Sequence, residues 1–236
     1  ESLTFIAVGG AKVSASLLER AQAAGLPVYE GYGFSESASV VSLNVPASHC
    51  NGTVGKPLAH IQLSINNDEV VVQGSNFLGY VNQPDTWYQK TVASGDLAEI
   101  DEQGFVHING RRKNVLINAY GRNINPEWLE SELQANGLIT QSVVFAEQQT
   151  ACVALVYAAP YVTEKKLEQW LQECNQNLPA YAQIKAWFRL KQPLDLSRGL
   201  LTATGKPKRP EISQHFQSTL SQLFQQAEIA APALEA

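Results

Sequence analysis

The first fifty residues show the hydrophobic pattern of a strand, a helix and a second strand. Residues 3–8 form a short apolar run that ends at a pair of glycines, which predicts a buried strand leading into a tight loop. Ser14 occupies an N-cap position before an apolar stripe at helical spacing. A second strand is expected at 27–30, and it opens onto a glycine-containing loop at 31–37. This order predicts the crossover of an α/β sheet, whose ligands lie at the carboxyl ends of the strands.

Residues 51–110 alternate between polar and apolar positions over short distances, which is typical of strands. Strands are expected at 60–65 and 69–74 around a polar turn, and the segment 97–110 is expected to form a two-stranded hairpin with its turn at 101–104. The pattern therefore predicts a small antiparallel sheet or open barrel beside the α/β part.

From residue 111 onward the pattern becomes that of a compact α+β module. Three helices are expected here: one that begins at Pro126 with Asn125 as its cap, one from Thr163, and one that starts at Pro210. The last helix is expected to place Ile212, Phe216, Leu220 and Leu223 on one face, and the tail after Ala227 is expected to fray. Between the helices, strands are predicted at 115–117, 142–145, 152–157 and 184–190.

The chain is thus expected to combine α/β and α+β architecture in two parts. Residues 1–110 form the larger part, with an α/β section at 1–50 and a β subdomain at 51–110. Residues 111–236 form a small second domain, which we expect to move relative to the first. The chain contains no methionine and runs almost directly into a strand, so we expect it to be a piece of a longer polypeptide.

The composition of the chain argues against a nucleic-acid partner or a transmembrane span. The chain is 44% hydrophobic, which suffices for buried cores, and its formal charge of -5 carries no basic surplus for a nucleic-acid surface. Three cysteines show neither close pairing nor metal-ligand spacing, which favours a reducing compartment. No segment has the pattern of a transmembrane span or a secretion signal. We therefore expect a soluble, cytoplasmic protein.

The hairpin at 97–110 has a carboxylate, Asp96, at one end and a guanidinium, Arg111, at the other. A carboxylate can accept from both hydroxyls of a cis-diol such as ribose, and a guanidinium can hold neighbouring phosphate or ribose oxygens. Together the two residues predict a nucleotide clamp. Without other motifs this segment would be better explained as an ordinary hairpin. The prediction of a nucleotide clamp therefore depends on further motifs elsewhere in the chain.

Two glycine loops of the α/β part suggest a slot for a flat ring. Gly9, Gly10 and Ala11 have almost no side chain, so a ring could lie directly on their backbone. Tyr32, on the other loop, could stack on the opposite face of that ring. The arrangement is similar to an adenine slot, although each residue alone is more typical of a turn or a rim aromatic.

Three further side chains suggest phosphate chemistry. Ser35 offers a hydroxyl to a phosphate oxygen, and Glu36 offers an oxygen ligand to Mg²⁺. Lys206 lies in a loop of turn residues and cations, and an ammonium on a flexible stem could stabilise negative charge on a phosphate. A solvated charge is the more common role for Glu36 or Lys206 taken singly, so their order along the chain carries the argument.

Five segments in this order resemble the motifs of the acyl-adenylate-forming (AMP-binding) superfamily, which includes acyl-CoA synthetases, peptide-synthetase adenylation domains and luciferases. The segment Gly31-Tyr32-Gly33-Phe34-Ser35-Glu36 resembles the Tyr-Gly-x-Thr-Glu motif, with serine in place of threonine. The others are 74–80 with Pro84, Asp85 and Thr86; the ribose-binding Ser94-Gly95-Asp96; the hinge motif Gly110-Arg111-Arg112-Lys113-Asn114; and the loop Leu201-Thr202-Ala203-Thr204-Gly205-Lys206, which resembles the loop that bears the family's catalytic lysine.

The resemblance implies the roles of these residues and the ligands that they bind. Lys206, Glu36 and Ser35 would be catalytic, with Glu36 on the metal. ATP or AMP would contact Gly9, Gly10, Ala11, Tyr32, Gly33, Asp96 and Arg111, while Lys113 would be the hinge and Arg122 would lie on the face that admits the thiol. The implied cofactors are ATP/AMP, Mg²⁺, and CoA or a phosphopantetheine thiol.

The resemblance also implies a reaction: a carboxylic acid is activated by ATP as an acyl-adenylate, and the acyl group is then passed to a thiol. An acyl-CoA synthetase of longer acids is the leading hypothesis, on the segments 120–127 and 199–209. An adenylating enzyme that loads a carrier protein and a non-catalytic AMP-binding module are the alternatives. The chain lacks the family's Ser/Thr/Gly-rich phosphate loop, so we expect residues 1–236 alone to be inactive.

Overall fold

The computed structural model describes residues 3–230 and confirms the predicted mixture of α/β and α+β architecture. The chain divides into two compact units, Glu1–Asn114 and Val115–Ala236, here called unit 1 and unit 2. Among the described residues, none of the helices combines the length and apolar character that a membrane span requires.

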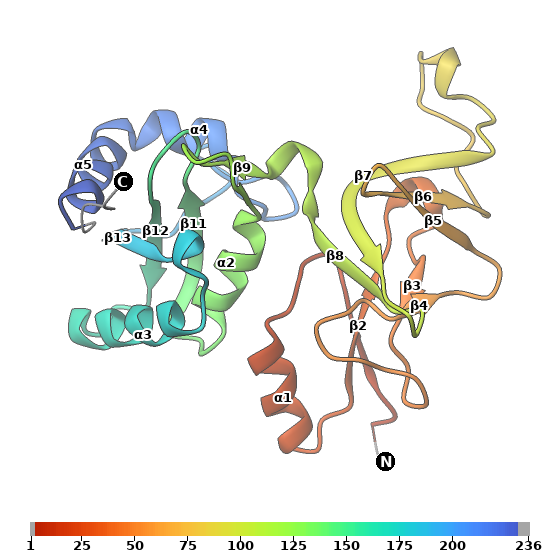
Figure 1. The fold of residues 1–236 in the computed structure, drawn as a ribbon, viewed down its shortest axis with the longest axis horizontal. Helices are drawn as coiled ribbons and strands as arrows, with labels where there is room; N and C mark the ends of the chain where they lie inside the picture. Colours follow the sequence, from red (N-terminus) through yellow and green to blue (C-terminus); the bar gives the residue numbers. More distant parts are fainter. Residues whose placement is uncertain (1–2, 231–236) are drawn as a thin grey trace. The chain divides into compact units, whose positions relative to one another are not determined.

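Unit 1 begins with the predicted crossover. Strand β1 (Ile6–Val8) and strand β2 (Val28–Tyr32) pair in parallel, and helix α1 (Ala15–Ala23) connects them (Figure 1). The Ser14 hydroxyl caps α1 by accepting from the Leu17 N–H at 3.3 Å. The prediction that β1 is buried is wrong: Ala7 is exposed, because β1 pairs with β2 alone within the part of the chain described.

A second sheet of unit 1 is antiparallel throughout, as the alternating pattern predicts. Its strands are ordered β5 (Gln62–Asn66), β6 (Glu69–Gln73), β7 (Thr91–Ile100) and β8 (Val106–Arg111), and short strands β3 (Ser42–Leu43) and β4 (Lys56–Pro57) extend the first sheet. Val41, Val70, Val72 and Val106 are completely buried in a common core. This core joins residues of the first sheet's loops to the second sheet, so unit 1 folds as one body.

Unit 2 is built on a three-stranded sheet that is covered on both faces. The sheet order is β11 (Ile139–Phe145), β12 (Cys152–Ala158) and β13 (Ile184–Arg189). Helices α2 (Pro126–Gln134) and α3 (Glu164–Gln176) pack on one face, and α4 (Arg209–His215) and α5 (Gln217–Ala230) pack on the other. A two-stranded ribbon, β9 (Leu116–Ile117) with β10 (Asn123–Ile124), precedes α2.

The division of the core follows from the two-residue period of a strand. Alternate residues of β12, such as Ala154 and Leu155, belong to opposite clusters: Ala154 lies with Leu129 of α2, and Leu155 lies with Ile212 of α4. Strand β12 therefore reads as a continuous apolar run, which is typical of a strand buried on both faces.

The single helix predicted from Pro210 is instead two helices. Phe216 has φ -107° and ψ 24°, which ends α4 before α5 begins at Gln217. The bend lets both helices follow the same sheet face, since Ile212 of α4 and Leu220 of α5 are buried in one cluster. The prediction that the chain frays after Ala227 is also wrong for residues 228–230, because Ala227 is fully buried and α5 continues. The rest of that tail, and Glu1 and Ser2, lie outside the described residues.

The buried face of α2 should carry much of the stability of unit 2. Leu129 is fully buried, whereas Leu196 of the same unit is 59% exposed. We expect Leu129→Ala to lower the free energy of unfolding of unit 2 by about 2–5 kcal/mol through lost burial and a cavity. Leu196→Ala should change it by less than about 0.5 kcal/mol. Urea denaturation followed by tryptophan fluorescence reports mainly on unit 2, which holds Trp128, Trp170 and Trp187; equal effects of the two variants would contradict the assigned core.

Candidate functional site

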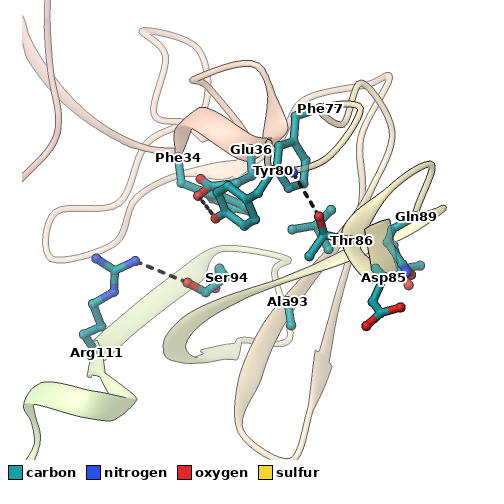
Figure 2. Close-up of a pocket in the computed structure, with 12 residues that line it drawn as sticks. Phe34, Glu36, Phe77, Tyr80, Asp85, Thr86, Gln89, Ala93, Ser94 and Arg111 are labelled. Carbon is teal, nitrogen blue, oxygen red and sulfur yellow. Dashed lines mark hydrogen bonds between the residues drawn. The ribbon is translucent and has the colours of Figure 1, made fainter. Parts of the chain in front are cut away.

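The β7–β8 ladder brings the two predicted clamp residues directly together. Asp96 and Arg111 are cross-strand partners, and the Arg111 Nε lies 3.3 Å from the Asp96 Oδ1. Asp96 is largely buried, with 15% of its side chain exposed, while 42% of the Arg111 side chain is exposed. The guanidinium thus pairs with the carboxylate through its Nε, and one Nη also donates to the Ser94 carbonyl oxygen at a long 3.5 Å (Figure 2). The exposed part of the group can still meet a ligand, because a guanidinium has five N–H donors.

Tyr32 joins this pair from the other sheet. The Tyr32 hydroxyl donates to the Asp96 Oδ2 at 2.7 Å. Burial and then the Asp96 charge raise the pKa of the Tyr32 phenol, so it stays protonated and acts as the donor. Both oxygens of Asp96 are thus held by fixed side chains, Oδ1 by Arg111 and Oδ2 by Tyr32, and a carboxylate oxygen can accept more than one hydrogen bond.

The turn that carries Asp96 is itself fixed. Gly95 has φ 78°, a left-handed conformation that favours glycine, and its N–H donates to the Glu69 Oε1 at 2.7 Å. The Asp96 N–H donates to the Ser94 hydroxyl at 3.0 Å. Asp96 is therefore held by its backbone as well as by Tyr32 and Arg111.

The two glycine loops lie side by side at the carboxyl ends of β1 and β2. A Cβ on Gly9 would be 3.1 Å from the Gly31 carbonyl oxygen, and Gly10 has φ 84° with open space around it. Ala11, the third residue of the predicted ring slot, is exposed. The space around Gly33 is smaller than that around Gly9, because a Cβ on Gly33 would lie 1.5 Å from the Ser39 carbonyl oxygen.

A cavity of about 300 Å³ lies between the loop after β2 and strand β7 (Figure 2). Glu36 and Arg111 both line it, so a carboxylate and a guanidinium face one space. Its other walls are Phe34, Phe77, Tyr80, Asp85, Thr86, Gln89, Thr91, Val92, Ala93 and Ser94. Ser35, next to Glu36 in the short 3₁₀ turn Ser35–Ser37, is exposed and is not among the lining residues.

Tyr80 makes a contact that the sequence did not lead us to expect. Its hydroxyl donates to the Glu36 Oε1, and its ring packs edge-on against Phe77 with centroids 4.9 Å apart (Figure 2). The available signal was the position of both aromatic residues in the segment 74–80. Tyr80 orients the carboxylate of Glu36 within the cavity.

Glu36 fits a limited role as a Mg²⁺ ligand. No group of three or more His, Cys, Asp or Glu side chains suited to a metal occurs among residues 3–230. Mg²⁺ commonly binds through one or two carboxylates together with substrate phosphates and water. One cavity-facing carboxylate therefore fits a metal that arrives with a nucleotide, and it does not fit a resident all-protein metal site.

The other predicted site residues lie on exposed turns. Lys113 is in the 3₁₀ turn Arg112–Asn114, the last residues of unit 1. Arg122 follows Gly121, which has φ 72°, in unit 2. Lys206, also in unit 2, is exposed in a loop closed by the bond from its N–H to the Thr202 hydroxyl at 3.0 Å. The structure thus gathers Tyr32, Asp96 and Arg111 into one array in unit 1, and places Arg122 and Lys206 in unit 2.

The chain matches two families over most of its length. Residues 1–80 match the family described as AMP-binding enzyme, and residues 113–228 match the AMP-binding enzyme C-terminal domain. It is 31% identical to the long-chain-fatty-acid–CoA ligase FadD15 of Mycobacterium bovis, over 92% of this chain and 41% of that protein. It is also 31% identical to the 2-succinylbenzoate–CoA ligase of Bacillus cytotoxicus, over 85% of this chain and 45% of that protein.

Solved structures show the same fold. The o-succinylbenzoate CoA synthetase of Bacillus subtilis, in complex with its acyl-adenylate intermediate, superimposes with a TM-score of 0.74 and 25% identity over 90% of this chain and 46% of that one. An anthranilate CoA ligase in complex with anthranoyl-AMP superimposes with a TM-score of 0.75 and 19% identity, over 93% and 46% of the two chains. The present chain spans less than half the length of these relatives.

The tight approach at Gly33 makes a structural prediction. Gly33→Ala would force the Ser39 backbone to move, and we expect it to destabilise unit 1 by about 3 kcal/mol or more. Gly52→Ala is the matched control, since Gly52 has φ 85° but open space around it, and the left-handed strain alone costs about 1–2 kcal/mol. Thermal denaturation followed by circular dichroism compares the two variants. An equal loss for both would show that Gly33 and Ser39 do not approach each other as described.

Proposed function

This chain belongs to the AMP-binding, adenylate-forming enzyme superfamily, and we propose that the protein is an ATP-dependent acid–thiol ligase. In the first step it activates a carboxylic acid as an acyl-adenylate and releases pyrophosphate. In the second step it transfers the acyl group to the thiol of CoA. The observation that carries the proposal is the Tyr32–Asp96–Arg111 array beside a cavity that Glu36 and Arg111 share. The region thus offers a diol acceptor, Asp96, a guanidinium suited to phosphate, Arg111, and a carboxylate, Glu36, that can serve phosphate through a bound cation.

The array suits the ribose and phosphate of AMP. The carboxylate oxygens of Asp96 accept from the ribose hydroxyls, and the exposed part of the Arg111 guanidinium donates to ribose or phosphate oxygens. Gly9, Gly10 and Ala11 present bare backbone to the adenine, and the exposed Ser35 hydroxyl donates to a phosphate oxygen. The side-by-side glycine loops support this placement of the base.

In the first half-reaction, a carboxylate oxygen of the acid attacks the α-phosphorus of ATP, and the bond to the pyrophosphate oxygen breaks. Negative charge builds on the α-phosphate oxygens as the new bond forms, and the Lys206 ammonium stabilises it. Mg²⁺ bound with the nucleotide would neutralise phosphate charge, and Glu36, oriented by Tyr80, would be its ligand from this chain.

In the second half-reaction, the sulfur of the thiol attacks the acyl carbon, and AMP leaves. Lys113 lies in the turn that ends unit 1, where a change of backbone angles would rotate unit 2. Such a rotation withdraws Lys206 and presents the exposed face of Tyr120, Gly121 and Arg122. The names of the sequence relatives, which are CoA ligases, support CoA as the acceptor.

Asp96 should control nucleotide affinity through the ribose. We expect Asp96→Asn to weaken AMP binding by about 10- to 100-fold, the loss of a charge-assisted hydrogen bond. Asp101→Asn, at the other end of the same hairpin, should leave the affinity within about twofold. Isothermal titration with AMP measures both variants. A 2′,3′-dideoxy-AMP probe should bind wild type and Asp96→Asn equally, and a preference for wild type would contradict the ribose contact.

The complete reaction should need more than this chain. Residues 1–236 lack a Ser/Thr/Gly-rich loop for the β- and γ-phosphates, so we expect this polypeptide alone to bind AMP but to show no carboxylate-dependent ATP–pyrophosphate exchange. Robust exchange would contradict that expectation.

The acceptor is tested separately with the full-length protein. Acyl-AMP formed by it should be discharged by CoA; discharge only by a phosphopantetheinyl protein would favour the carrier-loading alternative. Failure to form acyl-AMP from any acid in a panel of fatty and aromatic carboxylates would contradict the ligase itself.

A further inference from the structure

The loop that carries Lys206 is rigid within itself but exposed. The Thr202 N–H donates to the Lys206 carbonyl oxygen at 2.8 Å, and the Lys206 N–H donates to the Thr202 hydroxyl at 3.0 Å. Leu201 and Pro207 form an isolated β-bridge at its base. A loop of this kind moves as one piece, so the direction in which Lys206 points depends on what holds its two ends.

Both ends are anchored in unit 2, by different means. Before the loop, Leu200 is almost fully buried in the cluster between the sheet and α4–α5. After the loop, the Arg209 side chain contacts the helix layer on the other face of the sheet, where one of its Nη atoms donates to the Glu130 Oε1 on α2. Its Nε donates to the Val144 carbonyl oxygen at 3.2 Å. The Lys206 loop is thus tied to both layers of unit 2.

The Arg209–Glu130 pair is buried, with 16% and 9% of the two side chains exposed. The Glu130 Oε1 also accepts from the Val144 N–H at 2.9 Å, and Glu127 of α2 lies 3.9 Å from the other Nη of Arg209. Burial raises the pKa of the Glu130 carboxyl to about 7, against the opposing pull of Arg209 and the Val144 N–H. The contacts of Arg209 with the Glu130 carboxylate and the Val144 carbonyl oxygen are directional, so they define how the first turn of α4 is oriented on the sheet.

We propose that Arg209, held by Glu130, is the positioning residue of the Lys206 loop. This inference rests on the proposed role of Lys206 in adenylate formation. A purely structural role would lower all activities together with the folded fraction. A positioning role affects the half-reaction that uses Lys206 and spares the one that does not.

The test measures the two half-reactions separately in the full-length protein. For Glu130→Gln and Arg209→Lys we expect acyl-AMP formation to fall about 10- to 100-fold in kcat, the effect of a displacement near 1 Å, with KM for ATP within about twofold. Thioester formation from supplied acyl-AMP should stay within about twofold of wild type. Arg198→Lys is the matched control, because Arg198 also pairs with a carboxylate of unit 2, Asp195 at 2.7 Å, but on an exposed turn; it should change neither step.

Two further comparisons make the outcome decisive. If the pair acts as one device, Glu130→Gln combined with Arg209→Lys should cost no more adenylation than the worse single variant, whereas additive losses would overturn the inference. Equal losses in both half-reactions, or none in either, would also overturn it. Lys206→Ala separates the two claims: intact adenylation in that variant contradicts the proposed function, while strong loss there with unaffected Glu130 and Arg209 variants contradicts only the positioning role.

Discussion

The carboxylate of Asp96 is the point on which the architecture of unit 1 converges. Tyr32 reaches it from the end of β2 and Arg111 reaches it from β8, so one side chain ties the α/β crossover to the antiparallel sheet. The cost of burying this charge is offset by the hydrogen bond from a protonated phenol and by an ion pair on its exposed side. A carboxylate held in this way would be pre-organised for the ribose diol of the proposed nucleotide, because its oxygens keep a fixed direction before any ligand arrives.

Local signals in the sequence were sufficient for much of this structure. Ser14 and Asn125 were predicted as helix caps, and a helix was predicted to start at Thr163; each of the three side chains accepts from a backbone N–H of the first turn. The parallel crossover at the start of the chain and the β7–β8 hairpin were predicted from apolar runs and turn residues that lie close together in sequence. These features depend on neighbours within a few residues, and therefore each can be inferred from one short segment.

The predictions that were wrong, and the contacts that were not predicted, depend on residues far apart in the sequence. The bond from Tyr80 to Glu36 joins residues 44 positions apart, and the bond from Tyr32 to Asp96 spans 64. The break at Phe216 has no proline or glycine to mark it, and follows instead from the need of α4 and α5 to cover the same sheet face. Exposure of β1 likewise depends on which strands pair with it, a property of the sheet rather than of the apolar run.

The distribution of charge between the units is consistent with the proposed reaction. Unit 1 holds the acidic groups of the site, Asp96 and Glu36, together with Arg111, whereas Lys206 lies in unit 2. A lysine fixed beside Glu36 and Asp96 would pair with them, and its charge would already be neutralised when the α-phosphate needs it. In the proposed reaction, a lysine carried by a separate unit would avoid permanent pairing with those carboxylates, and it would act only if its own unit held it in a defined direction. In the positioning role proposed for Arg209, the buried Glu130–Arg209 contact at the base of the Lys206 loop would meet that requirement, because a charge-assisted hydrogen bond has a defined direction.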